Sequence, residues 1–406
     1  MSTASLKPLI YVSIETKVIP TVQKYYPALT GTVRACLAVF GAMSLKDRRK
    51  PLSLILETPS GYGKTAVLQM TFPISNTLLS KYVYRSDKFT PKSFVSHAAN
   101  VKKSKIGDID LLPRLRDKVL VSKELAPIFR GKEKELEENF SMLISVLDGT
   151  GFTSDSGMRG RRGYEEQIVF NWIGATTPLP KETHRLMSQL GTRLLFYEVP
   201  IVEPTEEELL EYAENDTSSE AETECNRVVN QFLMDFFAAH PVGSIEPDSI
   251  EIPKPLLNEL VQWAKFLTIG RREVKYENDG LGWDAIVAAT PEGPWKVINY
   301  FKELARGHAL IHGRTAVTEA DLELVGHVAI SSIPAYLRPI IHRLRDADSV
   351  SSAECTKLCR VSRPTARKHL RELELLEIVE VAKGSPETNE PDTAALSEKF
   401  RWIRRP

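Results

Sequence analysis

The most informative stretch of this chain is Thr58-Pro59-Ser60-Gly61-Tyr62-Gly63-Lys64-Thr65. It fits the pattern G-x-x-x-x-G-K-[ST] of a phosphate-binding loop, except that Thr58 stands where the pattern has its first glycine. An apolar run at residues 52–56 predicts a buried strand before the loop, and residues 66–70 continue as a helix. This order of strand, loop and helix is the context that gives the pattern its physical mechanism.

The residue types in this loop suit a nucleoside triphosphate. Gly61 and Gly63 let the backbone turn its amides toward phosphate oxygens, and the helix behind them adds its positive N-terminal end. Lys64 would reach the β- and γ-phosphates, so we expect it to be exposed rather than packed, and the Thr65 hydroxyl can bind Mg²⁺. We therefore expect ATP and Mg²⁺ here. The alternative is an ordinary Pro-Ser-Gly turn followed by a chance lysine.

Composition places the chain among ordinary soluble globular proteins. Its 406 residues, 42% hydrophobic and 26% charged, are enough for two or three domains. No run approaches the ~20 apolar residues of a membrane span, and the first residues lack the apolar core of a signal peptide, so we expect a cytoplasmic protein without membrane contact. The 53 basic and 53 acidic residues cancel. Contact with nucleic acid would therefore depend on local basic patches.

The pattern along the chain divides it into four parts. Residues 1–50 are predicted to be helical, and residues 51–205 alternate strand, loop and helix, which indicates an α/β core with a parallel sheet. Further strands are expected at 118–122, 169–175 and 194–199. Residues 206–340 contain an acidic segment, 214–224, that we expect to be a solvated loop or flexible insertion, and they carry helical periodicity after it. Residues 341–406 form a compact basic module.

An ATPase of this kind needs a carboxylate on a neighbouring strand to activate the attacking water. The best candidate is Glu124, because it ends the apolar run 119–122 and would lie at the carboxyl edge of the sheet. Lys123 occupies the position where an aspartate is usual. The alternative is that Glu124 only stabilises the start of the following helix.

Two later strands carry polar residues at their ends. Thr177 closes the apolar strand that begins near Val169, where a hydroxyl could contact the γ-phosphate. Arg193 precedes the next apolar strand, and an arginine there can stabilise the transition state of phosphoryl transfer, in its own subunit or in a neighbouring one. A surface salt bridge is the alternative for Arg193.

The order of these motifs resembles that of the AAA+ ATPases, most closely the branch of minichromosome-maintenance ring helicases. The resemblance spans roughly residues 25–330 and implies an α/β ATPase core with an α-helical lid. It places Thr177 at the first sensor position, Arg193 at the arginine finger, and Lys296 at the nucleotide-binding position of the second sensor. It also implies a ring or partial ring of identical subunits.

A glycine-rich segment, 149–164, separates a predicted helix from the strand of Thr177. It contains five glycines and three basic side chains that we call the hairpin arginines: Arg159, Arg161 and Arg162. In the family that it resembles, a hairpin at this place grips the DNA backbone. Such arginines would bind phosphates with little regard for sequence. A solvated flexible loop is the alternative.

The C-terminal module predicts a winged helix-turn-helix. A short helix at 351–359, a turn, a second helix at 364–373 and a strand at 376–382 follow one another. Ala366, Leu370 and Leu373 would face the core of the module. The opposite side carries four cations, which we call the basic row: Arg363, Arg367, Lys368 and Arg371. This row suits DNA, although such modules also dock proteins or serve as structural caps.

Together these features predict an ATP-dependent AAA+ motor that acts on DNA as a helicase or helicase loader. The rival hypothesis is a nucleotide-gated regulator or scaffold that hydrolyses ATP slowly or not at all. Lys123 favours the regulator, because a cation near the metal weakens the positioning of Mg²⁺. Arg193 and the hairpin arginines favour the motor.

Overall fold

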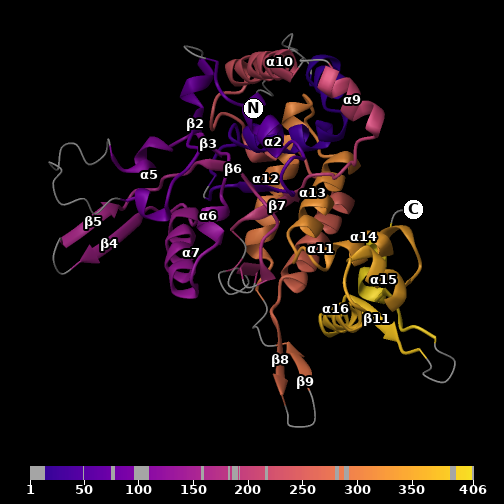
Figure 1. The fold of residues 1–406 in the computed structure, drawn as a ribbon. Helices are drawn as coiled ribbons and strands as arrows, with labels where there is room; N and C mark the ends of the chain where they lie inside the picture. Colours follow the sequence, from indigo (N-terminus) through magenta and orange to yellow (C-terminus); the bar gives the residue numbers. More distant parts are fainter. Residues whose placement is uncertain are drawn as a thin grey trace.

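The structure is a computed structural model. It describes residues 14–48, 50–74, 78–95, 109–156, 160–181, 183–184, 191, 193–214, 218–278, 283–287, 292–384 and 390–404. An α/β body carries two projecting hairpins and a smaller module at the C-terminal end (Figure 1). Within the described residues, no helix combines the length and the apolar character that a membrane span requires.

A five-stranded parallel sheet forms the centre of the body. Its strands, in the spatial order β2-β3-β6-β1-β7, are β2 (Val83–Arg85), β3 (Val119–Ser122), β6 (Asn171–Thr176), β1 (Ser53–Glu57) and β7 (Leu195–Glu198). All residues of β1, β3 and β6 are buried, as expected of a parallel sheet that is covered on both faces. The four strands predicted from apolar runs are confirmed, and β2 was not predicted.

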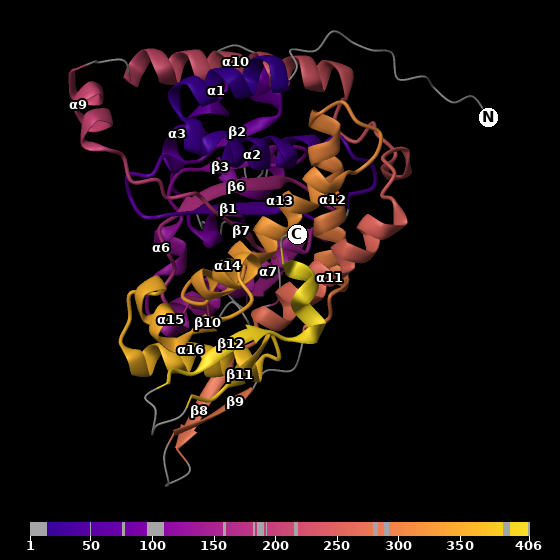
Figure 2. The ribbon, with the colours of Figure 1, turned by 90° about the vertical axis from the view of Figure 1, so that its right-hand side faces the viewer.

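Alternate side chains of these strands enter two apolar clusters, one on each face of the sheet. Leu54 and Leu56 join one cluster, and Ile55 between them joins the other. Figure 2 shows helices on both sides of the sheet. The first cluster includes α1 (Ile19–Tyr25), α2 (Thr30–Ala42), α3 (Lys64–Met70), α10 (Ser218–Ala239), α11 (Lys254–Gly270), α12 (Trp295–Ile311) and α13 (Glu319–Ser331). The second includes α5 (Leu111–Arg114), α6 (Ala126–Phe129) and α7 (Glu133–Leu147).

Helices of the segment 206–340 pack directly on the N-terminal helices. Helix α2 runs along α12, and a Cβ atom on Gly41 would lie 2.3 Å from the carbonyl oxygen of Gly307. This close approach requires glycine. The remaining short helices are η1 (Ile14–Val18), η2 (Pro27–Leu29), η3 (Leu78–Lys81), η4 (Pro91–Ser93), α9 (Glu206–Glu214), η6 (Pro247–Ser249) and η7 (Glu398–Ile403).

The acidic segment 214–224 was predicted to be a solvated loop or flexible insertion, and this prediction is wrong for residue 214, the last of α9, and for residues 218–224; residues 215–217 lie outside the described residues. Helix α10 begins at Ser218 and includes residues 218–224. Ala221 and Cys225 are buried, and Tyr25 donates a hydrogen bond to Glu224. Glu220 and Glu222 are exposed on either side of the buried Ala221, so the acidic composition concealed a helix with one packed side.

Two antiparallel hairpins project from the body. The first pairs β4 (Phe152–Ser156) with β5 (Gly160–Tyr164), where a hairpin was expected. The second pairs β8 (Val274–Asn278) with β9 (Trp283–Val287), and it was not predicted. Both stand away from the sheet and its helices in Figure 1.

The C-terminal module, which in the structure we take to begin with α14 at residue 338, contains three helices and a three-stranded antiparallel sheet. The helices are α14 (Arg338–Asp346), α15 (Ser352–Leu358) and α16 (Arg363–Leu375). The strands, in the order β10-β12-β11, are β10 (Val350–Ser351), β12 (Thr393–Leu396) and β11 (Val379–Ala382). The hydroxyls of Ser351 and Ser362 cap α15 and α16, which explains where these helices begin. The two helices and the strand β11 occur where they were predicted.

Candidate nucleotide-binding site

The phosphate-binding loop leaves β1 at the carboxyl edge of the sheet and enters α3. Gly61 and Gly63 have φ angles of 95° and 78°, in the left-handed region that glycine adopts without steric cost. A Cβ atom on Gly63 would lie 2.5 Å from a terminal methyl of Leu29, so a larger residue there would also require the Leu29 side chain to move. Strand β1 lies between β6 and β7, but the next strand along the chain is β2, an outermost strand of the sheet. Open α/β sheets bind ligands at such a switch point.

Lys64 is folded back onto its own loop. Its Nζ donates hydrogen bonds to the carbonyl oxygens of Thr58, at 3.2 Å, and Pro59, at 3.1 Å. The residue is only 6% exposed, so the prediction of an exposed lysine is wrong. Burial lowers the pKa of the Lys64 ammonium, and the negative charge of Glu124 opposes this shift. A phosphate bound in the loop would have to replace two carbonyl contacts of Lys64.

The other loop residues differ in how far they can be reached. Thr65 is exposed in the first turn of α3, where its hydroxyl can bind a metal ion beside the phosphates. Ser60 and Gly61 are also exposed, and Pro59 and Tyr62 are half-buried. Thr58 is 2% exposed, so its side chain is packed beneath the loop and out of reach of solvent.

Glu124 and Thr177 lie at the same edge of the sheet as the loop. Residues 124, 176 and 57 are level on the three adjacent strands, because Ser122 pairs with Gly174 and Glu57 with Thr176. Adjacent strands are about 4.8 Å apart, so two spacings, about 10 Å, separate Glu124 from the end of β1. The Glu124 carboxylate also accepts a hydrogen bond from the Ala126 amide at 2.8 Å. Glu124 therefore stabilises the start of α6, and its negative charge also acts on Lys64.

Arg130 also lies at the carboxyl ends of the strands, and it was not predicted from the sequence. Its Nη2 donates a hydrogen bond to the Thr177 hydroxyl at 2.8 Å. The two residues are 47 positions apart, and no motif includes Arg130. It brings a second positive charge to the site, in addition to that of Lys64.

Lys123 points to other partners. Its Nζ lies 5.2 Å from the centroid of the Phe72 ring, and its charge helps to lower the pKa of Asp87, mainly set by a hydrogen bond from Arg85. The cation at the expected aspartate position is thus directed toward the end of β2.

Arg193 and Lys296 meet at the opposite end of the sheet, where β1 and β7 begin. Both contact Asp148, at 3.0 and 3.4 Å, and Lys50 lies 3.6 Å from the same carboxylate. Burial alone would raise the pKa of Asp148, but the hydrogen bond from Arg193 and the three positive charges hold it below its ordinary value. Asp148 therefore stays ionised as the centre of a cation cluster.

This cluster is far from the phosphate loop of the same chain. Leu195 pairs with Leu54, so Arg193 is level with Leu52, six residues before Thr58. At roughly 3.3 Å per strand residue, the separation is about 20 Å, longer than an arginine side chain. Lys296 also contacts Asp148 and therefore lies far from the loop of its own chain. The prediction that Lys296 binds the nucleotide in that loop is wrong.

The described hairpin arginines are partly paired. Arg161 is 62% exposed at the side chain and forms a 2.7 Å ion pair with Glu165. Arg162 is opposite Ser154 in the hairpin, and Arg159 lies outside the described residues. Tyr164 anchors the base of the hairpin by a 2.9 Å hydrogen bond to Asp110.

The basic row of α16 is exposed, and the three apolar residues opposite it are buried, as predicted. Arg367 lies 3.1 Å from Asp392, and Arg371 lies 2.6 Å from Glu374. The row presents positive charge to solvent, and these acidic neighbours weaken it.

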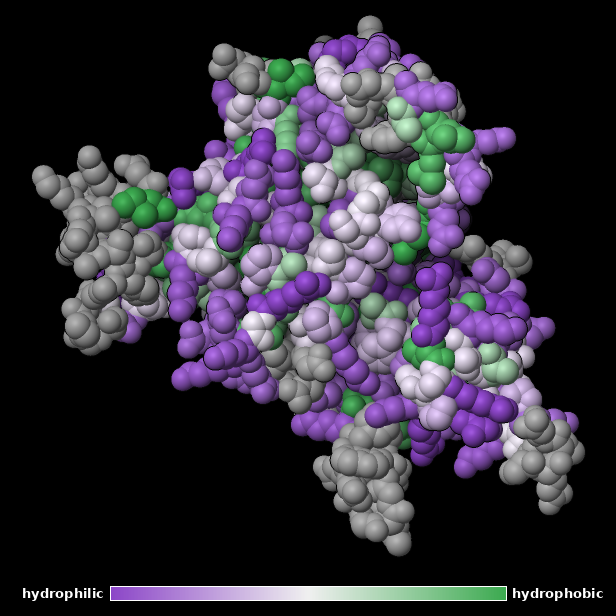
Figure 3. All heavy atoms as spheres, in the orientation of Figure 1, coloured by the Kyte–Doolittle hydropathy of each residue, from purple (hydrophilic) through white to green (hydrophobic). Residues whose placement is uncertain are grey.

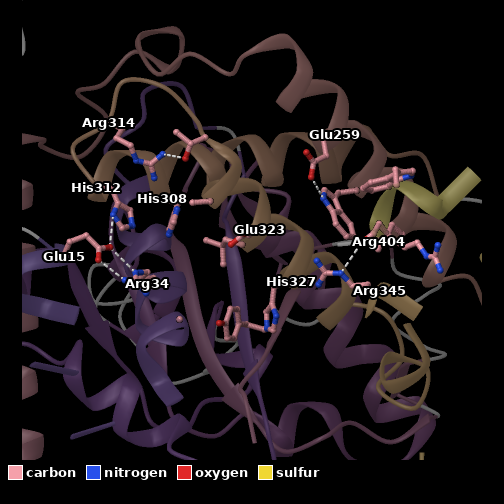
Figure 4. Close-up of a pocket in the computed structure, with 18 residues that line it drawn as sticks. Glu15, Arg34, Glu259, His308, His312, Arg314, Glu323, His327, Arg345 and Arg404 are labelled. Atoms are coloured by element: carbon pink, nitrogen blue, oxygen red, sulfur yellow. Dashed lines mark hydrogen bonds and ion pairs between the residues drawn. The ribbon is translucent and has the colours of Figure 1, made fainter. Parts of the chain in front are cut away.

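A large cavity of about 990 Å³ lies apart from the phosphate loop, between α2, the helices α11, α12 and α13, and the C-terminal tail (Figure 4). It is lined by charged and aromatic side chains that already contact one another. Arg34 pairs with Glu15 at 2.9 Å, Arg314 with Asp321 at 2.6 Å, and Trp263 packs against Trp402. The cavity did not follow from any motif.

Comparison of the chain with models of known protein families and with curated proteins returned no match in either search. The geometry of the loop and of the two sheet edges is therefore the basis for assigning a function.

Proposed function

We propose that this protein is an AAA+ ATPase that binds ATP with Mg²⁺ and acts on DNA as a motor, of the helicase or helicase-loader type. The observation that carries the proposal is the loop 58–65, with two left-handed glycines and a lysine, at the switch point of a parallel sheet. Glu124 and Thr177 at the same edge add the polar groups that phosphoryl transfer requires.

Each side chain at this edge has a role in the proposed reaction. Lys64 binds the β- and γ-phosphates, and Glu124 accepts a proton from the attacking water. Thr177, held by Arg130, orients that water or the γ-phosphate. Mg²⁺ would be held by the Thr65 hydroxyl, the nucleotide phosphates and water, a donor set that this ion accepts; when bound, it neutralises charge on the phosphates.

The location of Arg193 supports catalysis between subunits. An arginine about 20 Å from its own loop can act only on the nucleotide of a neighbouring chain. Lys296 would join it there. This head-to-tail arrangement forms a ring when its rotation closes.

Exposed apolar side chains also support assembly. Trp295, beside Lys296, is 78% exposed, and Leu209 and Leu210 of α9 are 53% and 62% exposed. Figure 3 shows green, apolar side chains gathered at α9. Apolar groups gathered on a surface commonly mark a contact with another protein.

DNA would contact two elements. The hairpin arginines are candidates for gripping the backbone during turnover, and the C-terminal module, proposed as a winged helix, would supply initial affinity through its basic row.

The rival function is a nucleotide-gated regulator that turns ATP over slowly. Two observations favour it: Lys123 supplies no carboxylate for the metal, and Glu124 is engaged in capping α6. An ATPase assay with and without DNA, combined with mass measurement in ATP and Mg²⁺, separates the two. DNA-stimulated turnover by an oligomer supports the motor, whereas binding of ATP without turnover supports the regulator.

A further inference from the structure

Glu57, the last residue of β1, is buried beside the phosphate loop and holds two other parts of the chain. One carboxylate oxygen accepts a hydrogen bond from the Leu179 amide at 3.0 Å, just after Thr177. The other forms an ion pair with Arg338 in the first turn of α14. Both side chains are only 1% exposed. A single carboxylate thus joins the loop strand, the segment after β6 and the C-terminal module.

Helix α14 repeats this contact one turn later. His342 lies 3.3 Å from Glu198, the last residue of β7, and Glu198 is the register partner of Glu57. Residues 338 and 342 are four apart and share one face of the helix. Helix α14 therefore lies across the carboxyl ends of β1 and β7, where the phosphate loop begins.

A second connection joins the module to the segment after Thr177. Lys181 forms a 2.9 Å ion pair with Glu372 of α16, which is buried, and its Nζ lies 4.6 Å from the centroid of the Tyr336 ring. His184, in the same segment, is buried near Arg338: burial, together with the positive charges of Arg338 and Arg271, lowers its pKa to about 3. His184 is thus neutral and does not compete with Arg338 for Glu57.

We propose that Glu57 and Arg338 are positioning residues of the nucleotide site, through which the C-terminal module sets the geometry of the phosphate loop and of Thr177. The inference rests on the proposed function. It assigns the module a role in ATP turnover that is separate from contact with DNA. The module contributes to the site because the charge of Arg338 is buried against Glu57, at the end of β1 where the phosphate loop begins.

The physical chemistry of a buried ion pair gives a clean test. Removing one partner leaves an uncompensated buried charge and strongly destabilises a protein, whereas replacing both by neutral residues is often tolerated. The double variant Glu57→Gln/Arg338→Met should therefore stay folded while losing the ion pair that joins β1 to α14. The matched control is Arg343→Met/Glu354→Gln. It removes a 2.9 Å ion pair between α14 and α15, and this ion pair does not involve the central sheet.

The double variant should bind ATP with a Kd within about threefold of wild type, since it keeps the loop contacts. Its kcat should fall about 10²-fold, the effect of small misplacements remote from the chemistry. The control should keep the wild-type kcat. A folded double variant with the wild-type kcat overturns the inference alone. A wild-type protein that binds no ATP overturns the proposed function together with it.

Hydrogen exchange on the wild-type protein supplies a second measurement, which needs no variant to fold. Binding of a non-hydrolysable ATP analogue should slow exchange of the backbone amides of α14, since the loop and α14 share Glu57. Exchange in α14 that stays unchanged, while amides of the phosphate loop become protected, overturns the inference.

Discussion

Replacing Arg193 with alanine should remove ATP turnover and leave ATP binding nearly unchanged. The arginine is about 20 Å from the loop of its own chain, so every contact of that loop persists. An arginine that stabilises this transition state contributes about 10³–10⁵-fold in rate, so turnover should fall below about 0.1% of wild type. The fold should survive, because Lys50 and Lys296 still neutralise Asp148.

Mixing this variant with an equal amount of Lys64→Ala protein should restore part of the activity. An active interface needs the loop of an Arg193→Ala chain and the arginine of a Lys64→Ala chain. Random head-to-tail assembly creates this combination at about one interface in four, so turnover should recover to about a quarter of wild type. The assay is steady-state phosphate release at fixed total protein.

A matched control is Arg116→Ala. Arg116 lies at the same sheet edge and forms a 2.6 Å ion pair with Glu166, away from Asp148. This variant should keep wild-type turnover. Recovery no greater than the sum of the two inactive proteins would refute the reasoning, as would a monomeric mass in ATP and Mg²⁺.

The remaining predictions concern the phosphate loop, the base and the DNA-binding elements. Lys64→Ala should abolish ATP binding in calorimetry, and because Lys64 is buried its melting temperature must be measured in parallel; undiminished affinity contradicts the loop assignment. Glu124→Gln should preserve binding and slow hydrolysis on the order of 10²-fold, and equal turnover excludes it as the base. Neutralising the hairpin arginines should remove DNA stimulation of the ATPase, and stimulation that persists favours a solvated loop. Neutralising the basic row should flatten the salt dependence of DNA binding by about 0.9 for each DNA phosphate that the row no longer neutralises; an unchanged slope indicates a docking or structural module.

The strands and the phosphate loop could be predicted because their signals are local. Leu54, Ile55 and Leu56 of β1 are buried and form an apolar run in the sequence, and the left-handed backbone at positions 61 and 63 explains the two glycines. The helices and strand of the C-terminal module also leave local signals, in serine caps and apolar spacing. Local chemistry is therefore enough to predict these elements and their order, whereas β2 and the β8–β9 hairpin were missed.

The contacts that complete the site could not be predicted, because they join residues far apart in the sequence. Arg130 follows a short helix and resembles a surface arginine until the fold brings it to Thr177. Glu57 and Arg338 have no feature in the sequence that pairs them. Lys296 was grouped with the loop of its own chain, and only the register of β7 beside β1 shows that it lies at the other edge.

In the proposed ring, the residues at the two ends of the sheet would act on different nucleotides. Each phosphate loop would be completed from two directions: by its own C-terminal module, through Glu57 and Arg338, and by Arg193 of a neighbouring chain. Because Arg193 contacts Asp148 and lies far from Glu57, the two contributions are physically independent within one chain. Mutations at distant, independent sites contribute additively, so the loss of both should multiply their effects on the rate. An isolated subunit would keep the first contribution and lack the second, which makes turnover a property of the assembly.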